Sequence, residues 1–140
     1  IPDLPPPAPS RLPALRAEID RLFDVPTLAA LVAGLDQQDS EFAREARKAL
    51  ARVSPLAAAC TLEHLRRLGA TPDLRHALSE EYNFTHRAQA QSDFLEGIRA
   101  MIIDKDRKPR WRHARAEDVT PDEVAQLLAP LGPDALTFSE

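Results

Sequence analysis

The chain has 140 residues, a formal net charge of −4 and a pI of about 5.6, and 44% of its residues are hydrophobic. The acidic balance argues against a general nucleic-acid binder, while the apolar content is sufficient for one modest domain with a real core. No apolar run approaches the roughly 20 residues that cross a bilayer, so we expect neither a nucleic-acid nor a membrane partner.

The first nine residues, IPDLPPPAP, contain five prolines and predict an extended linker over 1–9. Residues 10–140 then form the predicted folded region. The only methionine is Met101, so residue 1 is not a translation start. We therefore expect a piece of a longer protein, with its first residue produced by cleavage or by a boundary inside the linker.

Three helices are expected between residues 10 and 53. Ser10 can cap the first, Thr27 the second, and Asp39 or Ser40 the third. Apolar residues recur at helical spacing in each of them. These residues are Leu12, Leu15, Ile19, Leu22 and Phe23, then Leu28, Leu31, Val32 and Leu35, then Phe42, Ala46, Ala49, Leu50 and Val53.

Three further helices are expected between residues 55 and 105. Pro55 suits the first turn of a helix that stops near Gly69. The run Thr71-Pro72-Asp73 supplies an N-cap, a first-turn proline and an acid for the next helix, which continues toward residue 88. The last of the three covers 93–105. Its apolar face consists of Phe94, Leu95, Ile98, Met101 and Ile102.

Thr120 and Glu123 have the spacing of a capping box and predict a seventh helix, with Val124, Leu127 and Leu128 on its apolar side. The alternation of β-branched and aromatic residues that is typical of strands is absent. The chain is therefore predicted to be all-α. Short connections favour antiparallel packing of neighbouring helices.

Few residues have the pattern of a catalytic or metal site. The four histidines lack the spacing of a helical zinc site. The lone Cys60 excludes an internal disulfide and a multi-cysteine metal cluster, and no paired motif activates it as a nucleophile. A single cysteine also fits a reducing compartment, so we expect a cytoplasmic protein. We expect no catalytic residue and no metal site in this chain.

Glu80 and Glu81 are the carboxylates that come nearest to an acid–base candidate. Glu81 lies beside the apolar stripe that includes Tyr82, and a partly buried carboxyl with a raised pKa could act as an acid. An ion pair with an arginine, such as Arg87 or Arg99, is the interpretation that we favour.

A basic segment follows the predicted 93–105 helix, offset only by Asp104 and Asp106. Its cations are Lys105, Arg107, Lys108, Arg110 and Arg112. They could form a solvated helix end with surface ion pairs, each worth about 0–1 kcal/mol, at the negative end of the helix dipole. They could also hold a phosphate-bearing ligand.

The stretch DFLEGIRAMIIDKDRKPRW at 93–111 resembles the C-terminal signature of the 3-hydroxyisobutyryl-CoA hydrolases, a branch of the enoyl-CoA hydratase/isomerase (crotonase) superfamily. That signature reads D-F-x-E-G-V-R-A-x-L/I-I-D-K-D followed by x-x-P-x-W. The matching residues are Asp93, Phe94, Glu96, Gly97, Arg99, Ala100, Ile103, Asp104, Lys105, Asp106, Pro109 and Trp111. Further similar elements occur in order at 54–62, 81–82, 119–120 and 130–132, so the resemblance covers roughly residue 10 to the end.

The chain departs from the family pattern at two places. It has AAAC at 57–60 where the family usually has a lysine before a T-L pair. It has RAQAQS at 87–92 where the family commonly reads C-M-R-G-H. These differences concern the identity of the acyl group of the substrate more than they concern the resemblance to the superfamily.

The resemblance implies that this chain is the helical C-terminal region of a crotonase-like α/β protein and packs on an N-terminal core that carries the catalytic groups. The implied reaction is hydrolysis of an acyl-CoA thioester, with CoA entering as part of the substrate and no permanently bound cofactor. A homo-oligomer is left open. Lys105 lies in the matching D-K-D and is the first candidate for CoA contact; Arg107, Lys108, Arg110 and Trp111 are the others.

Alternatives remain at two levels. The enzyme could be an enoyl-CoA hydratase or isomerase, or the chain could be a free-standing helical module that binds a partner protein through the 94–102 face. Trp111 could stack on adenine or anchor its loop, and we favour the anchor. Phe94, Met101 and Ile102 are expected in a core, which the missing domain could share. Gly97 costs about 1 kcal/mol relative to Ala inside a helix, which a close helix crossing would explain.

Overall fold

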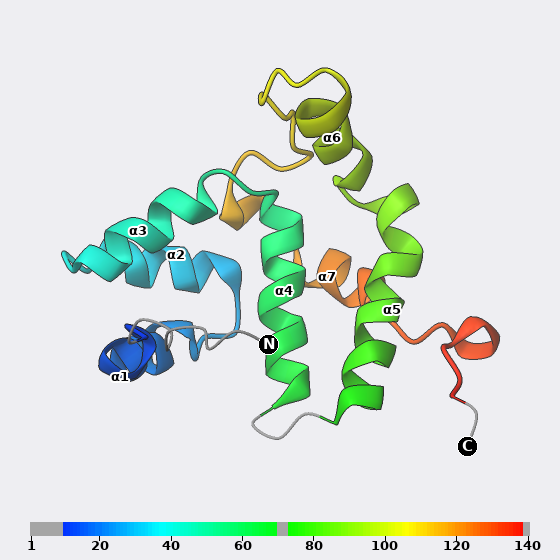
Figure 1. The fold of residues 1–140 in the computed structure, drawn as a ribbon, viewed down its shortest axis with the longest axis horizontal. Helices are drawn as coiled ribbons and strands as arrows, with labels where there is room; N and C mark the ends of the chain where they lie inside the picture. Colours follow the sequence, from blue (N-terminus) through cyan, green and yellow to red (C-terminus); the bar gives the residue numbers. More distant parts are fainter. Residues whose placement is uncertain (1–9, 70–72, 139–140) are drawn as a thin grey trace, which may run out of the picture.

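The computed structural model describes residues 10–69 and 73–138, so the predicted linker at 1–9 lies outside it. Within this part the chain forms seven α-helices and no strand, which confirms the all-α prediction (Figure 1). The helices are α1 Leu12–Phe23, α2 Leu28–Asp36, α3 Glu41–Leu50, α4 Pro55–Leu68, α5 Leu74–Gln91, α6 Phe94–Ile98 and α7 Pro121–Leu127. A π-helical turn, η1 Arg99–Ile103, continues α6, and two 3₁₀ turns are η2 Ala116–Asp118 and η3 Gly132–Asp134.

Most helix starts lie where the capping residues predicted them. The hydroxyls of Thr27 and Ser40 each accept a hydrogen bond from the backbone N–H three residues later. Pro55 is the first residue of α4. Thr120 accepts from the N–H of Glu123, whose carboxylate accepts from the N–H of Thr120 in return, which is the predicted capping box. These bonds satisfy N–H groups that a first helical turn leaves free.

Two helix starts differ in detail from the prediction. The N-cap residue of α1 is Arg11 and not Ser10, although the Ser10 hydroxyl accepts an N–H of the first turn at 3.2 Å. For α5, Thr71 and Pro72 lie outside the described residues. The capping side chain is that of Asp73, which accepts from a first-turn N–H at 3.2 Å. The acid thus performs the capping role that the sequence pattern had assigned to the threonine.

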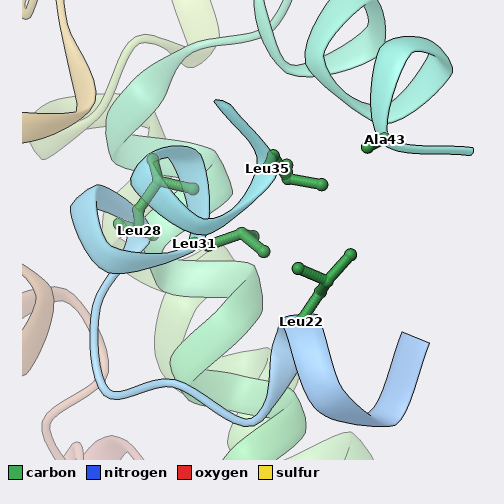
Figure 2. Close-up of a cluster of buried hydrophobic side chains, with 6 residues drawn as sticks. Leu22, Leu28, Leu31, Leu35 and Ala43 are labelled. Atoms are coloured by element: carbon green, nitrogen blue, oxygen red, sulfur yellow. The ribbon is translucent and has the colours of Figure 1, made fainter. Parts of the chain in front are cut away.

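The core consists of two clusters of buried side chains. The first joins α1, α2, α3 and α4, and Figure 2 shows its leucines extending into the space between α1, α2 and α3. Its buried members are Leu22, Leu28, Leu31, Leu35, Ala43 and Ala59. The second joins α4 to the end of α7 through Leu56, Cys60, Leu127 and Leu128. Helix α4 contributes to both clusters and therefore connects the two halves of the core.

Helix α4 lies in the middle of the arrangement, with α2 and α3 on one side and α5 and α7 on the other (Figure 1). α4 and α5 lie side by side and antiparallel, as their short connection predicted. Gly69 ends α4 at φ 66°, a left-handed conformation that glycine adopts without steric cost. No helix in the described ranges is long and apolar enough to cross a membrane.

The α6–η1 segment lies at one end of the molecule, beyond the upper ends of α4 and α5 (Figure 1). Several of its apolar side chains are exposed, among them Phe94 at 53%, Met101 at 50% and Ile102 at 64%. These three residues therefore do not lie in a core formed by the described chain alone, and a core that they share with a missing domain stays a prediction. The regular helix is also shorter than predicted, because it gives way to a π-helical turn after Ile98. No described element covers this face, so helical periodicity alone did not bury it.

Candidate functional site

Residues 93–112 form one closed unit, the α6–η1 helix and the loop that returns beside it. Asp93 joins its two ends, because one carboxylate oxygen accepts from the backbone N–H of Arg112 at 2.8 Å. The other oxygen accepts from the hydroxyl of Ser54 at 2.5 Å, and this hydroxyl also caps α4. Asp93 is only 8% exposed. The loop is therefore fastened both to its own helix and to the start of the central helix.

Arg99 is the centre of the unit. Its Nε and Nη2 donate to the two carboxylate oxygens of Glu96 at 2.9 and 2.7 Å. Its Nη1 donates to Asp104 at 2.6 Å and to Asp106 at 2.9 Å, and Nη2 also donates to the carbonyl of Lys108 at 3.1 Å. One guanidinium thus binds three carboxylates and one main-chain carbonyl, which fixes the path of the loop.

These bonds keep Glu96 and Asp106 ionised. Hydrogen bonds from Arg99, and then one from the backbone N–H of Arg110, lower the pKa of Glu96 to about 2. The Arg99 guanidinium and the backbone N–H of Lys108 lower the pKa of Asp106 as well. The same carboxylates raise the pKa of Arg99. At neutral pH Glu96, Asp106 and Arg99 are charged, and carboxylates of the loop neutralise the positive charge of Arg99.

The charged side chains of the cations that the sequence singled out lie outside this network, although the backbones of Lys108 and Arg110 take part in it. The side chains of Lys105, Arg107, Lys108 and Arg110 are exposed, and none forms an ion pair with a carboxylate of the described residues. Lys105 and Arg107 have φ values of 54° and 55°. Such left-handed backbone is uncommon for residues with a side chain and persists where surrounding contacts enforce it. The structure therefore brings the candidate cations together on one exposed loop.

Trp111 lies half-buried against α6. A Cβ placed on Gly97 would lie 3.7 and 3.8 Å from two carbons of the indole ring, and no second helix comes as close. The expected helix crossing at Gly97 is therefore replaced by an aromatic ring. This contact supports the anchor interpretation of Trp111, because the ring holds the returning loop against the helix.

A mostly apolar pocket of about 420 Å³ opens beside this contact. Its wall includes Val53, Ala57, Phe84, Phe94, Met101 and Trp111. The pocket lies between the start of α4, α5 and the exposed face of α6. An apolar group could enter it, while the cations of the loop lie beyond its rim.

The remaining acid candidates, Glu80 and Glu81, lie in α5. Glu80 lies 3.5 Å from the guanidinium of Arg67, and Glu81 is exposed. The expected ion pair with an arginine is present for Glu80, but its partner is Arg67. The two arginines named as examples bind elsewhere: Arg87 donates to main-chain carbonyls, and Arg99 binds the acids of its own loop. Glu80 is partly buried but paired with Arg67, and Glu81 is exposed, so neither is the buried, unpaired carboxyl that an acid catalyst needs.

Cysteine and histidine residues form no reactive group among the described residues. Burial raises the pKa of the Cys60 thiol to about 11, so the thiolate is not formed near neutral pH. His113 contacts the carboxylate of Glu123, with Nε2 2.9 Å from Oε1. No group of three or more His, Cys, Asp or Glu within the described ranges could hold a metal ion.

The sequence did not single out Arg99 as the organiser of the loop. It had offered this residue only as one example of an arginine that could pair with Glu80 or Glu81. Two signals were present: Glu96 and Arg99 are three residues apart on a helix, a spacing at which side chains meet, and two aspartates follow within seven residues. Only the path of the returning loop in the structure shows that the Arg99 guanidinium binds Glu96, Asp104 and Asp106 together.

Comparisons with known proteins agree on a family. The family model described as enoyl-CoA hydratase/isomerase matches residues 2–128. A mitochondrial 3-hydroxyisobutyryl-CoA hydrolase of Gallus gallus is 36% identical over 114 residues, which are 81% of this chain and 29% of that protein. The corresponding protein of Rattus norvegicus is 35% identical over 121 residues, 86% of this chain and 31% of that protein. The chain thus spans roughly a third of the curated relatives it matches.

Solved structures give the same result. An enoyl-CoA hydratase from Rhodobacter sphaeroides 2.4.1 is 62% identical with a TM-score of 0.88, over 99% of this chain and 40% of that chain. A carnitinyl-CoA dehydratase from Mycobacterium thermoresistibile is 35% identical with a TM-score of 0.78, over 93% of this chain and 37% of that chain. The helical arrangement is therefore the one that these proteins use for part of their length.

Proposed function

Because the chain belongs to the enoyl-CoA hydratase/isomerase family, we propose that it is the C-terminal part of an acyl-CoA thioester hydrolase that acts on 3-hydroxyisobutyryl-CoA. Hydrolysis would release the free acid and CoA, which is a step of valine breakdown. The curated relatives with this name support the choice of substrate. The catalytic groups belong to an N-terminal core of the same protein, where two backbone N–H donors stabilise the oxyanion of the thioester and a carboxylate assists the reaction.

The role of this chain is to cover that core and to bind the CoA part of the substrate. The observation that carries this role is the exposed loop whose cations are free of the carboxylates beside them. CoA carries a diphosphate and a 3′-phosphate, which Lys and Arg side chains bind through charge-assisted hydrogen bonds. Lys105 is the first candidate, with Arg107, Lys108 and Arg110 beside it. Trp111 holds the loop in place.

The proposed N-terminal core would pack on the exposed apolar face of α6–η1. Phe94, Met101 and Ile102 form an apolar group at one end of the bundle, and covering such a group would stabilise the assembly. A second copy of the protein could share the same face, so a homo-oligomer belongs to the proposal. A cytoplasmic location stays a prediction, and the curated relatives have "mitochondrial" in their names.

A matched pair of lysine substitutions tests the binding role in the natural full-length protein. Lys105→Ala should raise the KM for the acyl-CoA about tenfold with little change in kcat, since it removes a phosphate contact. Lys48→Ala removes an exposed lysine of α3, which is distant in sequence from the loop, and should change neither KM nor kcat. Equal KM values for the two variants would contradict a CoA contact by Lys105. A full-length protein without affinity for CoA thioesters would favour the interaction-module alternative.

Enoyl-CoA hydration is the second candidate activity. The solved structure with 62% identity carries the name of an enoyl-CoA hydratase. The two activities separate in one assay series, in which the full-length protein receives 3-hydroxyisobutyryl-CoA or crotonyl-CoA. Release of free CoA thiol from the first substrate supports the hydrolase. Loss of the crotonyl double bond without thiol release supports the hydratase.

A further inference from the structure

We infer that Arg99 is a positioning residue: it binds the carboxylates of Asp104 and Asp106 and thereby leaves Lys105 and Arg107 available to an anionic ligand. The inference rests on the proposed binding of CoA by this loop. It assigns a role to a residue that touches no substrate in that proposal, and it explains how a segment that alternates acids and bases can bind an anion.

Acidic and basic residues alternate along this loop, which would allow each acid to neutralise a neighbouring cation. In Asp104-Lys105-Asp106-Arg107 each cation has an acid as its chain neighbour. An acid that paired with Lys105 or Arg107 would compete with a phosphate for the same charge. The sequence alone gives no reason for the acids to leave these cations free.

The backbone separates the two kinds of side chain. The backbone of Lys105 and that of Arg107 both adopt a left-handed conformation, with φ of 54° and 55°. Asp104 and Asp106, which alternate with them, both reach Nη1 of Arg99, at 2.6 and 2.9 Å. The acids therefore converge on one guanidinium, while the exposed cations form no ion pair with a described carboxylate.

The loop also depends on the shape of the arginine side chain. All three guanidinium nitrogens of Arg99 are used, since Nε and Nη2 bind Glu96, Nη1 binds the two aspartates and Nη2 also binds the carbonyl of Lys108. A lysine carries the same charge on one nitrogen and cannot span these acceptors. Position 99 therefore requires both the charge and the planar fork.

The test compares single and combined substitutions in the full-length protein, with CoA itself as the probe in a calorimetric titration. Arg99→Gln should weaken CoA binding about tenfold, because the carboxylates of Asp104 and Asp106 then lack the guanidinium that neutralises them and lie beside the cations. The triple variant Arg99→Gln/Asp104→Asn/Asp106→Asn should recover to within about threefold of the parent protein, since the competing charges are gone. Arg16→Gln is the matched control, because Arg16 also binds an aspartate, Asp20, on the helix surface at 3.0 Å.

Two results would overturn the inference. One is a folded Arg99→Gln variant that binds CoA as the parent does. The other is a weakened Arg99→Gln variant that the two asparagines fail to rescue, because a purely structural role would not respond to removal of the charges. Circular dichroism and the thermal midpoint establish that each variant is folded.

If Arg99→Gln does not fold, Asp104→Asn/Asp106→Asn with Arg99 intact decides the question. Asparagine keeps an acceptor for Arg99 and removes the competing charge, so CoA binding should stay equal or become tighter. Weaker binding by more than about threefold would overturn the inference. Failure of the proposed function looks different: the parent protein would not bind CoA, or Lys105→Ala would bind it unchanged.

Discussion

Glu96 and Arg99 form a two-pronged ion pair across one turn of α6–η1, with both carboxylate oxygens accepting from the guanidinium at 2.7 and 2.9 Å. The Oε1 atom of Glu96 accepts a further bond from the backbone N–H of Arg110 at 2.6 Å. The pair therefore links the helix to a residue fourteen positions later in the sequence. Its contribution to stability depends on the charge of Glu96, which pH controls.

Acid should remove the contribution of Glu96. The pKa of this carboxyl falls from 4.5 to about 2 on folding, chiefly through Arg99. Since the folded pKa is the lower one, the stabilisation is complete above about pH 4.5 and is lost as the pH falls through about 2. In urea unfolding at a series of pH values, Glu96→Gln should be less stable than the parent near neutrality, and the two should converge toward about pH 2. A stability difference that does not change with pH would contradict this assignment.

Asp93 should be a strong stability determinant without contacting any ligand. Its buried carboxylate accepts from the Ser54 hydroxyl and from the backbone N–H of Arg112. Asp93→Ala leaves both donors without a partner and should lower the free energy of unfolding by about 2 kcal/mol. Asp93→Asn keeps an acceptor and should cost less. Asp134→Ala, at an exposed position, is the control in the same urea titration, and an equal effect of the two alanines would contradict the role of Asp93.

The first core cluster should respond to leucine truncation according to burial. Leu35 in α2 is 0% exposed, whereas Leu12 in α1 is 64% exposed. Leu35→Ala should lower the free energy of unfolding by about 2–5 kcal/mol through lost burial and a residual cavity. Leu12→Ala should remain within about 0.5 kcal/mol of the parent. Thermal or urea unfolding measures both, and a large effect at Leu12 would show that another part of the natural protein covers it.

Two glycines should respond to alanine with opposite signs. At Gly97 a Cβ meets the Trp111 ring at ordinary contact distance, so Gly97→Ala should stabilise the protein by up to about 1 kcal/mol through helix propensity. At Gly69 there is open space, but φ is 66°. Gly69→Ala should therefore destabilise by about 1 kcal/mol. Thermal midpoints of the two variants test the contrast, and a destabilised Gly97→Ala variant would mean that the indole ring cannot yield.

Helix starts were predictable from sequence because capping is local. Thr27, Ser40 and Thr120 each bond an N–H three residues away, so the residues that decide the start lie within one turn. The start of α5 was misplaced because two candidate caps, Thr71 and Asp73, stand close together. Choosing between them requires the path of the preceding chain.

Burial was less predictable than helix position. Periodicity identified Leu31 and Leu35 correctly, and it made the same prediction for Met101 and Ile102, which are exposed. An apolar stripe states which side of a helix can be buried, but a second element must be present to bury it. In α6–η1 no described element supplies that cover.

By itself the sequence determined the helical class, most helix starts, the resemblance to a family and the group of cations after residue 104. These depend on interactions within a few residues or on motif order. Only the tertiary structure decided that the acids among those cations bind Arg99, and that Trp111 packs on Gly97. Both contacts join residues that the returning loop brings together, and their geometry depends on the whole path of the chain between them.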